Sequence, residues 1–158
     1  MPQSAIDQPT VDSAATSRIA VEHVTQMAGD LFTAMLRMPF QPEPRVGECL
    51  DCPDIQATVR VTGQWNAEIH VIASNELARR IGYAMFGTEP EDLSDEEICD
   101  AMGEVANVIG GNAKGVVDSD SNLSLPEVGE PNLHWPEHAL VATYLCDDCP
   151  LTVVTIES

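Results

Sequence analysis

Basic side chains are scarce in this sequence of 158 residues. Seven Lys and Arg stand against 26 Asp and Glu, so the formal net charge at pH 7 is −19, and Lys114 is the only lysine. A protein that binds nucleic acid or an anionic membrane needs a basic face that neutralises phosphates. Because this composition offers no such face, neither nucleic acid nor a membrane surface is an expected partner.

Aromatic side chains and long apolar runs are also scarce. Phe, Trp and Tyr make up 4% of the chain and the broad hydrophobic class 44%, which predicts a core of aliphatic and methionine side chains. No apolar run is long enough to span a membrane, and the segment from Met1 to Ala15 lacks the basic start and apolar stretch of a signal peptide. We therefore expect a cytoplasmic protein with a mobile tail at residues 1–16 and one domain at residues 17–158.

The spacing of apolar residues predicts the elements of the first half of this domain. Three- and four-residue steps predict one long helix that starts from Ser17 as its cap and continues until Pro39 stops the pattern, and residues 45–50 follow as a short strand. Strict alternation over residues 55–62 predicts a half-buried strand, paired in a hairpin with residues 67–73. A second helix follows this hairpin, capped by Ser74 or Asn75 and closed by Gly87.

A third helix and a further group of strands complete the pattern. Ser94 and Glu97 form a capping box that opens a helix from Asp95 to about Val117. Residues 123–128, 139–146 and 150–157 then predict strands, the last two joined in a hairpin around Asp147 and Asp148. Strands separated by helices favour an α+β domain, with a mostly antiparallel sheet and long helices packed on one face.

The third helix has an apolar face and a polar face. Its apolar stripe, which we expect to face the sheet, comprises Ile98, Met102, Val105, Ile109, Ala113 and Val116. On the opposite side lies a row, here called the signature row, formed by Asp100, Glu104, Asn107 and Gly111. Gly103, Gly110 and Gly111 lie in or near the row, where each costs about 1 kcal/mol relative to Ala but lets another backbone approach closely. The row is therefore either a solvated surface or a face that docks another protein.

The segment Asp100-Ala-Met-Gly-Glu104-Val-Ala-Asn107 resembles the signature of the CheX/CheC/FliY phosphatases. That signature is Asp or Ser, three residues, Glu, two residues, Asn, and a proline further on. The order of elements from about residue 17 to 157 is also similar to CheX, including the turn Val61-Thr-Gly-Gln-Trp65 and the segment Leu123-Ser-Leu-Pro126. Pro126 follows Asn107 more closely than the proline of the family pattern does, and Pro131 follows it at a greater distance. We assign Pro126 because of its strand context.

The resemblance implies a CheC/CheX-like fold and hydrolysis of the aspartyl phosphate of a CheY-type response regulator. Asn107 would orient the attacking water, since a carboxamide both donates and accepts hydrogen bonds and brings no negative charge to the phosphoryl group. Glu104 would dock on the regulator's active-site lysine, with Asp100 and Gly111 contributing to the contact. The regulator supplies Mg²⁺, so catalysis needs no cofactor from this chain, and dimers among the family members imply a homodimer. The alternative is a non-enzymatic module that binds a receiver domain or is clamped by zinc.

Two copies of Cys-x-Asp-Cys-Pro are not explained by this resemblance. Cys49 and Cys52 form the first pair and Cys146 and Cys149 the second. Each pair could supply half of a tetrahedral zinc site, although the two pairs lie much further apart in the chain than the two halves of a zinc ribbon. Separate redox or idle pairs and disulfides are the other interpretations. If the zinc interpretation is correct, all four thiolates converge at one end of the sheet.

Overall fold

A seven-stranded antiparallel sheet is the central element of the computed structural model, which describes residues 17–42, 53–118 and 120–158. The strand order is β1-β6-β7-β3-β2-β4, and β5 pairs with β2 beside β4. The strands are β1 (Phe40–Pro42), β2 (Ile55–Gly63), β3 (Ala67–Ala73), β4 (Ser121–Leu123), β5 (Glu127–Gly129), β6 (Leu140–Cys146) and β7 (Cys149–Glu157). The predicted tail at residues 1–16 and the predicted strand at 45–50 lie outside the described residues.

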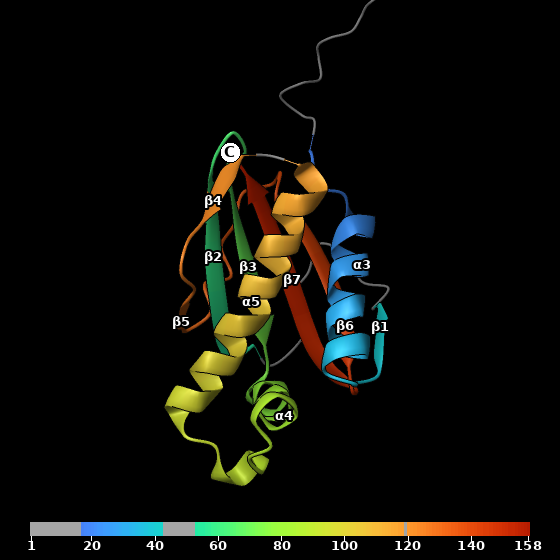
Figure 1. Ribbon diagram of the computed structural model, residues 1–158, viewed down its shortest axis with the longest axis vertical. Coiled ribbons are helices and arrows are strands. Elements are labelled where there is room, and N and C mark those ends of the chain that lie inside the picture. Colours follow the sequence, from blue (N-terminus) through green and yellow to red (C-terminus); the bar gives the residue numbers. More distant parts are fainter. Residues whose placement is uncertain (1–16, 43–52, 119) are drawn as a thin grey trace, which may run out of the picture.

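The helices are α3 (Val21–Asp30), α4 (Asn75–Phe86) and α5 (Asp95–Val117), with a π-helical turn η1 (Leu31–Met35) and a 3₁₀ turn η2 (Pro90–Asp92). α3 and α5 cover one face of the sheet, and α4 lies across its lower end against α5 (Figure 1). The predicted α+β class with helices on one face is thus confirmed. Among the described residues, no helix combines the length and the apolarity that crossing a bilayer demands.

The two later helices begin and end where the sequence predicts. The Ser94 hydroxyl accepts from the Glu97 N–H at 3.1 Å, and the Glu97 carboxylate accepts from the Ser94 N–H at 3.0 Å, which completes the capping box of α5. Ser74 caps α4, and Gly87 ends it in the left-handed region at φ 75°. These ends are correctly predicted because the capping partners lie within four residues of one another.

The first helix is shorter than predicted. It begins after Ala20 rather than Ser17, and η1 replaces its last turns before Leu36. Ser17 does not cap the helix, because its hydroxyl donates to Glu157 at the end of β7. A contact between residues 140 positions apart cannot be inferred from helical spacing.

Glu157 ties the start of the described chain to its last strand. Its carboxylate accepts hydrogen bonds from Ser17, from the backbone N–H groups of Arg18 and Ile19, and from Trp65 Nε1 at 2.8 Å. Burial by itself raises the pKa of Glu157, but these hydrogen bonds outweigh it and leave the pKa below its usual value. Since the folded-state pKa is depressed, this group stabilises the fold above the unfolded-state pKa, and the contribution is lost as pH falls through the folded-state pKa.

We therefore expect Glu157→Gln to lower the free energy of unfolding by about 1 kcal/mol at pH 7. The difference from the unsubstituted protein should shrink as the pH falls below about 4, because the wild-type carboxyl then becomes protonated. Urea denaturation at a series of pH values measures both effects. An equal difference at pH 7 and at acid pH would contradict this account of Glu157.

The topology repeats once within the chain. One half consists of α3, β1, β2 and β3, and the other of α5, β4, β6 and β7. In each half a helix leads to a short strand that pairs with the hairpin of the other half: β1 with β6, and β4 with β2. The two hairpins meet at the antiparallel pair of β3 and β7, and α3 and α5 run in opposite directions over them (Figure 1). The repeat was not predicted from the sequence, and it makes α3 the counterpart of α5.

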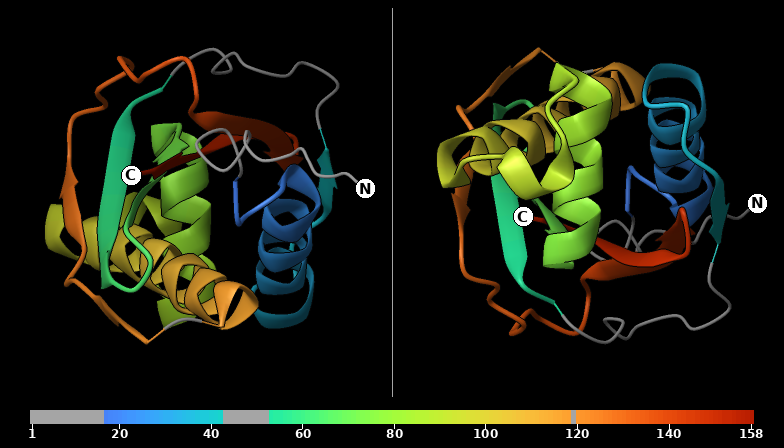
Figure 2. Two further views of the ribbon diagram at one scale, coloured as in Figure 1. Left: turned by 90° about the horizontal axis from the view of Figure 1, so that it is seen from above. Right: turned by 90° about the horizontal axis from the view of Figure 1, so that it is seen from below.

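The outer face of the sheet is partly covered, which corrects the prediction for β2. The alternation of the strand places Gln56 and Thr58 toward solvent, but they are only 7% and 6% exposed. They hydrogen-bond to each other and to His70, and Gln56 Oε1 accepts from the N–H of Asn132 at 2.9 Å. Figure 2 shows the segment between β5 and β6 passing outside the sheet, away from the helices. This segment removes the outer face of β2 from water.

Candidate active site

α5 is fixed to the sheet by its apolar face. The predicted stripe is buried except for its last member: Val116 is 42% exposed because it lies in the last helical turn. The buried positions of the helix are Ile98, Ala101, Met102, Gly103, Val105, Ala106, Ile109, Gly110 and Ala113. They lie against β2 and β3 and against α3 and α4. The opposite face of α5 is therefore held in a defined orientation toward solvent.

The signature row lies on that outward face. Asp100, Glu104, Asn107 and Gly111 are all exposed, at successive steps of four, three and four residues along the continuous helix. Within the described part of the chain, none of these three polar side chains forms a hydrogen bond or an ion pair. Two carboxylates and one carboxamide are thus displayed on a rigid element with their polar atoms available to a partner. Such an arrangement binds a partner without first breaking internal contacts.

The structure corrects the interpretation of two of the three glycines. A Cβ added at Gly110 would lie 2.8 Å from Val59 Cγ2 and 2.9 Å from Leu123 Cδ1. A Cβ at Gly103 would lie 3.1 Å from Pro126 Cγ. Both glycines therefore let α5 approach its own sheet rather than another protein. Gly111 alone matches the prediction, since it is exposed and a Cβ there would meet nothing within 4 Å.

This difference between adjacent glycines predicts opposite effects of the same substitution. Gly110→Ala should lower the free energy of unfolding by about 1 kcal/mol or more, because the clash with Val59 and Leu123 exceeds the gain in helix propensity. Gly111→Ala should raise it by up to about 1 kcal/mol, because only the propensity gain remains. Urea denaturation of both variants tests the pair. Equal stabilisation by the two substitutions would rule out the close packing at Gly110.

Pro126 lies where a proline can affect the signature row. Its ring contacts Gly103, the residue directly before Glu104. Pro131, by contrast, follows β5 on the segment that passes outside the sheet, away from the helices (Figure 2). The contact supports the choice of Pro126 over Pro131, although the spacing to Asn107 differs from the family pattern.

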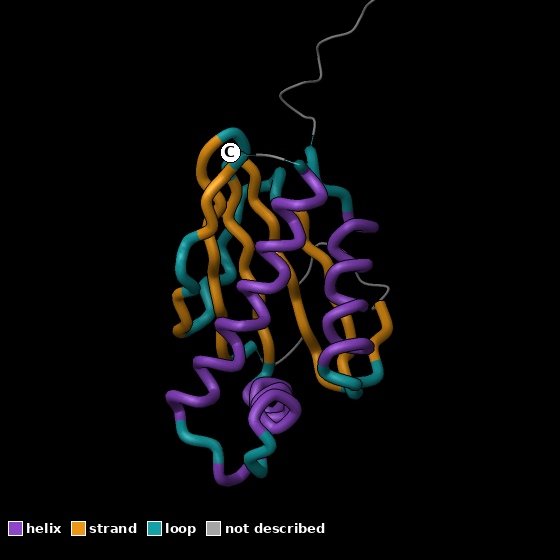
Figure 3. The backbone as a smooth tube through the Cα atoms, viewed as in Figure 1, coloured by secondary structure: helices purple, strands orange, loops and turns teal. Residues whose placement is uncertain are grey.

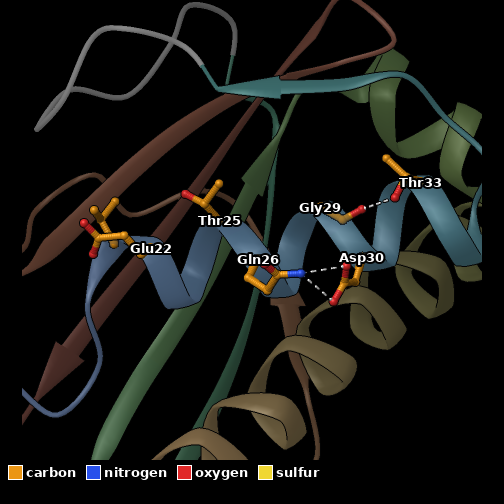
Figure 4. Close-up of a pocket in the computed structure, with 7 residues that line it drawn as sticks. Glu22, Thr25, Gln26, Gly29, Asp30 and Thr33 are labelled. Atoms are coloured by element: carbon orange, nitrogen blue, oxygen red, sulfur yellow. Dashed lines mark hydrogen bonds between the residues drawn. The ribbon is translucent and has the colours of Figure 1, made fainter.

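Helix α3, the counterpart of α5 in the repeat, carries residues at the spacing of the signature row, but their side chains are differently engaged. Glu22, Thr25 and Gly29 have the same spacing as Glu104, Asn107 and Gly111, so one constant offset along the chain relates the two sets. The three α3 residues line an open pocket on the outer side of that helix (Figure 4). The hydroxyl of Thr25, at the position of Asn107, is 2.9 Å from the hydroxyl of Tyr144 and hydrogen-bonds to it. The constant offset is a sequence signal that could have revealed the repeat.

No carboxamide in the α3 pocket is free in the way that Asn107 is. Gln26, the amide in this pocket, donates to the Asp30 carboxylate at 3.0 and 3.2 Å (Figure 4). The signature row of α5 is therefore the better candidate for chemistry that needs an unengaged amide.

The second cysteine pair lies on the predicted hairpin. Cys146 and Cys149 face each other across the turn between β6 and β7, in which Asp147 and Asp148 have φ values of 51° and 65°. Cys146 is fully buried in the main core, and burial together with the nearby Cys149 raises the pKa of its thiol.

The proposed zinc site has no support in the structure. Over residues 17–42, 53–118 and 120–158, no three His, Cys, Asp or Glu side chains are grouped so that they could hold a metal ion. Cys49 and Cys52 lie outside the described residues, so the convergence of the two pairs is untested. The signature row is therefore the candidate site that the described residues support.

Comparison with known families decides the kinship of the chain. Residues 55–141 match the family model described as chemotaxis phosphatase CheX, and this match includes the whole of α5. The chain belongs to the CheX family. The resemblance inferred from Asp100, Glu104 and Asn107 is thereby confirmed at the level of the family, whose description is that of a chemotaxis phosphatase.

Solved structures show the same CheX fold. The CheX protein of Vibrio vulnificus has a TM-score of 0.73 at 18% identity, over 90% of this chain and 99% of that one. A chemotaxis protein described as putative from Desulfovibrio vulgaris Hildenborough has a TM-score of 0.70 at 22% identity, over 87% and 96% of the two chains. A CheX–CheY–BeF3–Mg²⁺ complex from Borrelia burgdorferi has a TM-score of 0.69 at 17% identity, over 89% and 99%. Comparison with curated proteins gave no match.

Proposed function

We propose that this CheX-family protein hydrolyses the aspartyl phosphate of a CheY-type response regulator, with Asn107 orienting the attacking water. The observation that carries the proposal is the signature row: Glu104 and Asn107 lie one turn apart on the outward face of α5, with no intramolecular partner among the described residues. The membership of the family supports the reaction class. The residue roles are our own assignment.

The chemistry requires little from this chain beyond placing a water molecule. Hydrolysis needs a water in line with the departing aspartyl oxygen, and negative charge builds on the phosphoryl oxygens as the bond breaks. The Asn107 carboxamide oxygen accepts a hydrogen bond from the water, and its NH₂ group can donate one. A carboxylate at this position would repel the phosphoryl group, whereas the neutral amide does not.

Glu104 supplies the docking contact in this proposal. Its exposed carboxylate lies one turn before Asn107, where it can pair with the lysine of the regulator's phosphorylation site. Asp100 and Gly111 extend the contact at the two ends of the row, and Gly111 leaves room there because it has no side chain. The related Borrelia burgdorferi complex holds CheY, BeF3 and Mg²⁺ together with CheX. By analogy, the regulator brings the Mg²⁺ that neutralises the phosphoryl charge.

The proposed function is tested by measuring the rate at which a CheY-type regulator loses its aspartyl phosphate in Mg²⁺, with a substoichiometric amount of this protein. A phosphatase accelerates phosphate loss through many turnovers per molecule. A module that only binds the receiver domain leaves the rate unchanged or slows it by shielding the phosphate. Absence of acceleration with every regulator that binds the protein would overturn the proposal in favour of the binding module.

Two further expectations accompany this function. We propose a homodimer, because the family that the signature row resembles includes dimers, and equilibrium sedimentation tests it. We also keep the cytoplasm as the expected location, since a response regulator is the proposed partner.

A further inference from the structure

The segment from β4 to β5 runs alongside α5 in the opposite direction. Leu123 lies against Gly110, and Pro126 lies against Gly103, seven residues nearer the start of the helix. The residues between Leu123 and Pro126 therefore lie beside the part of α5 between Gly103 and Gly110. Asn107 lies in that part of the helix, four residues after the first glycine and three before the second. Figure 3 shows this loop between the two short strands at the edge of the sheet.

The backbone of this loop is held firmly at Ser124. The Ser124 N–H donates to the Arg60 carbonyl at 2.8 Å, and the Ser124 hydroxyl accepts from the Arg60 N–H at 2.8 Å. The same hydroxyl donates to the carbonyl of Leu125 at 3.0 Å. Because Pro126 packs on Gly103, the backbone of Leu125 is anchored on both sides, at Ser124 and at Pro126.

Leu125 is nevertheless in solvent. Leu125 is 86% exposed, more than any other large apolar residue of the described part of the chain. A single exposed leucine is ordinary on a protein surface. Here, however, the leucine lies on a fixed loop that passes α5 at the level of Asn107, next to a helix face whose exposed side chains are polar or acidic. A partner seated on Asn107 and Glu104 would cover Leu125 as well.

We propose that Leu125 is an apolar docking residue for the receiver domain of the phosphorylated regulator. This inference rests on the proposed function and extends its contact surface from α5 to the β4–β5 loop. Glu104 and Asp100 contribute charge interactions that salt weakens, whereas burial of Leu125 contributes a salt-independent part of the affinity. The occupant is the same partner that Asn107 serves, because the loop passes α5 at the level of Asn107.

The test measures the dissociation constant of a CheY-type regulator loaded with beryllofluoride and Mg²⁺. We expect Leu125→Ser to weaken binding about tenfold or more, and to raise KM while kcat stays within about twofold. Leu133→Ser is the matched control, since Leu133 is also exposed but lies on the segment toward the outer face. The control should bind within about twofold of the unsubstituted protein. Thermal unfolding of both variants verifies that the fold is retained.

The outcomes separate this inference from the proposed function. Unchanged affinity of Leu125→Ser, or an equal loss in Leu133→Ser, overturns the docking role of Leu125 even where the wild type is an active phosphatase. Binding without hydrolysis by the wild type overturns the proposed function, while the affinity of Leu125→Ser still decides the docking role. No binding of the loaded regulator by the wild type overturns both.

Discussion

Asn107→Ala should reduce accelerated dephosphorylation of the regulator about 100-fold or more, to a rate close to that of the regulator alone. The reason is that the methyl side chain can neither accept nor donate the hydrogen bonds that hold the water in line. Binding should change little, because docking in the proposed complex depends on Glu104 and its neighbours. The measurement compares single-turnover dephosphorylation rates and dissociation constants for the two proteins.

The structure provides a close control for this experiment. Asn112 is exposed on the same helix but outside the signature row, so Asn112→Ala applies the same chemical change five residues away. We expect Asn112→Ala to retain activity within about twofold. Stability should be preserved in both variants, because neither side chain is buried. Full activity of Asn107→Ala would refute the assignment of the water-positioning residue.

Glu104→Lys should lower kcat/KM about 100-fold or more, chiefly through weaker binding. In the proposed complex, the substitution replaces an attractive contact with the regulator's lysine by a repulsive one. The loss should be larger than that of Glu104→Ala, which removes the attraction without adding repulsion. Steady-state kinetics over a range of regulator concentrations separate the effect on KM from that on kcat.

Glu137→Lys controls for the change in net charge. Glu137 is exposed on the segment that passes the outer face of the sheet, so its reversal alters the total charge equally but leaves α5 untouched. We expect activity within about twofold of the wild type at about 0.15 M salt, where charges more than about 8 Å apart are largely screened. A comparable loss in this control would mean that overall charge, and not a contact at Glu104, governs association.

Much of the site was predictable because its determinants are local. The capping box at Ser94 and the apolar stripe fixed both the bounds and the phase of α5, so the outward position of Glu104 and Asn107 followed from helical geometry. The turn at Asp147 and Asp148 likewise follows from two flanking strands and a two-residue connection. Such features depend on residues within a few positions of one another.

Other features failed prediction because distant residues decide them. Gly103 and Gly110 looked like an opening for a partner, but residues 123–126 of the same chain fill that space. Gln56 and Thr58 alternate as solvent-facing residues do, yet a segment from the far half of the chain lies over them. Ser17 has the side chain of a helix cap, but Glu157 engages its hydroxyl. Periodicity reports which face a residue occupies and not what covers that face.

The sequence by itself determined the class of fold, the helix that carries Glu104 and Asn107, and the kinship with CheX, because these depend on residue spacing within segments and on the order of the segments along the chain. Only the tertiary structure decided that Thr25 is engaged while Asn107 is free, and that Leu123 and Pro126, on the two sides of the exposed Leu125, pack against α5. Those relations join segments that are distant in the sequence, and they exist only once burial of the apolar core has brought the segments together.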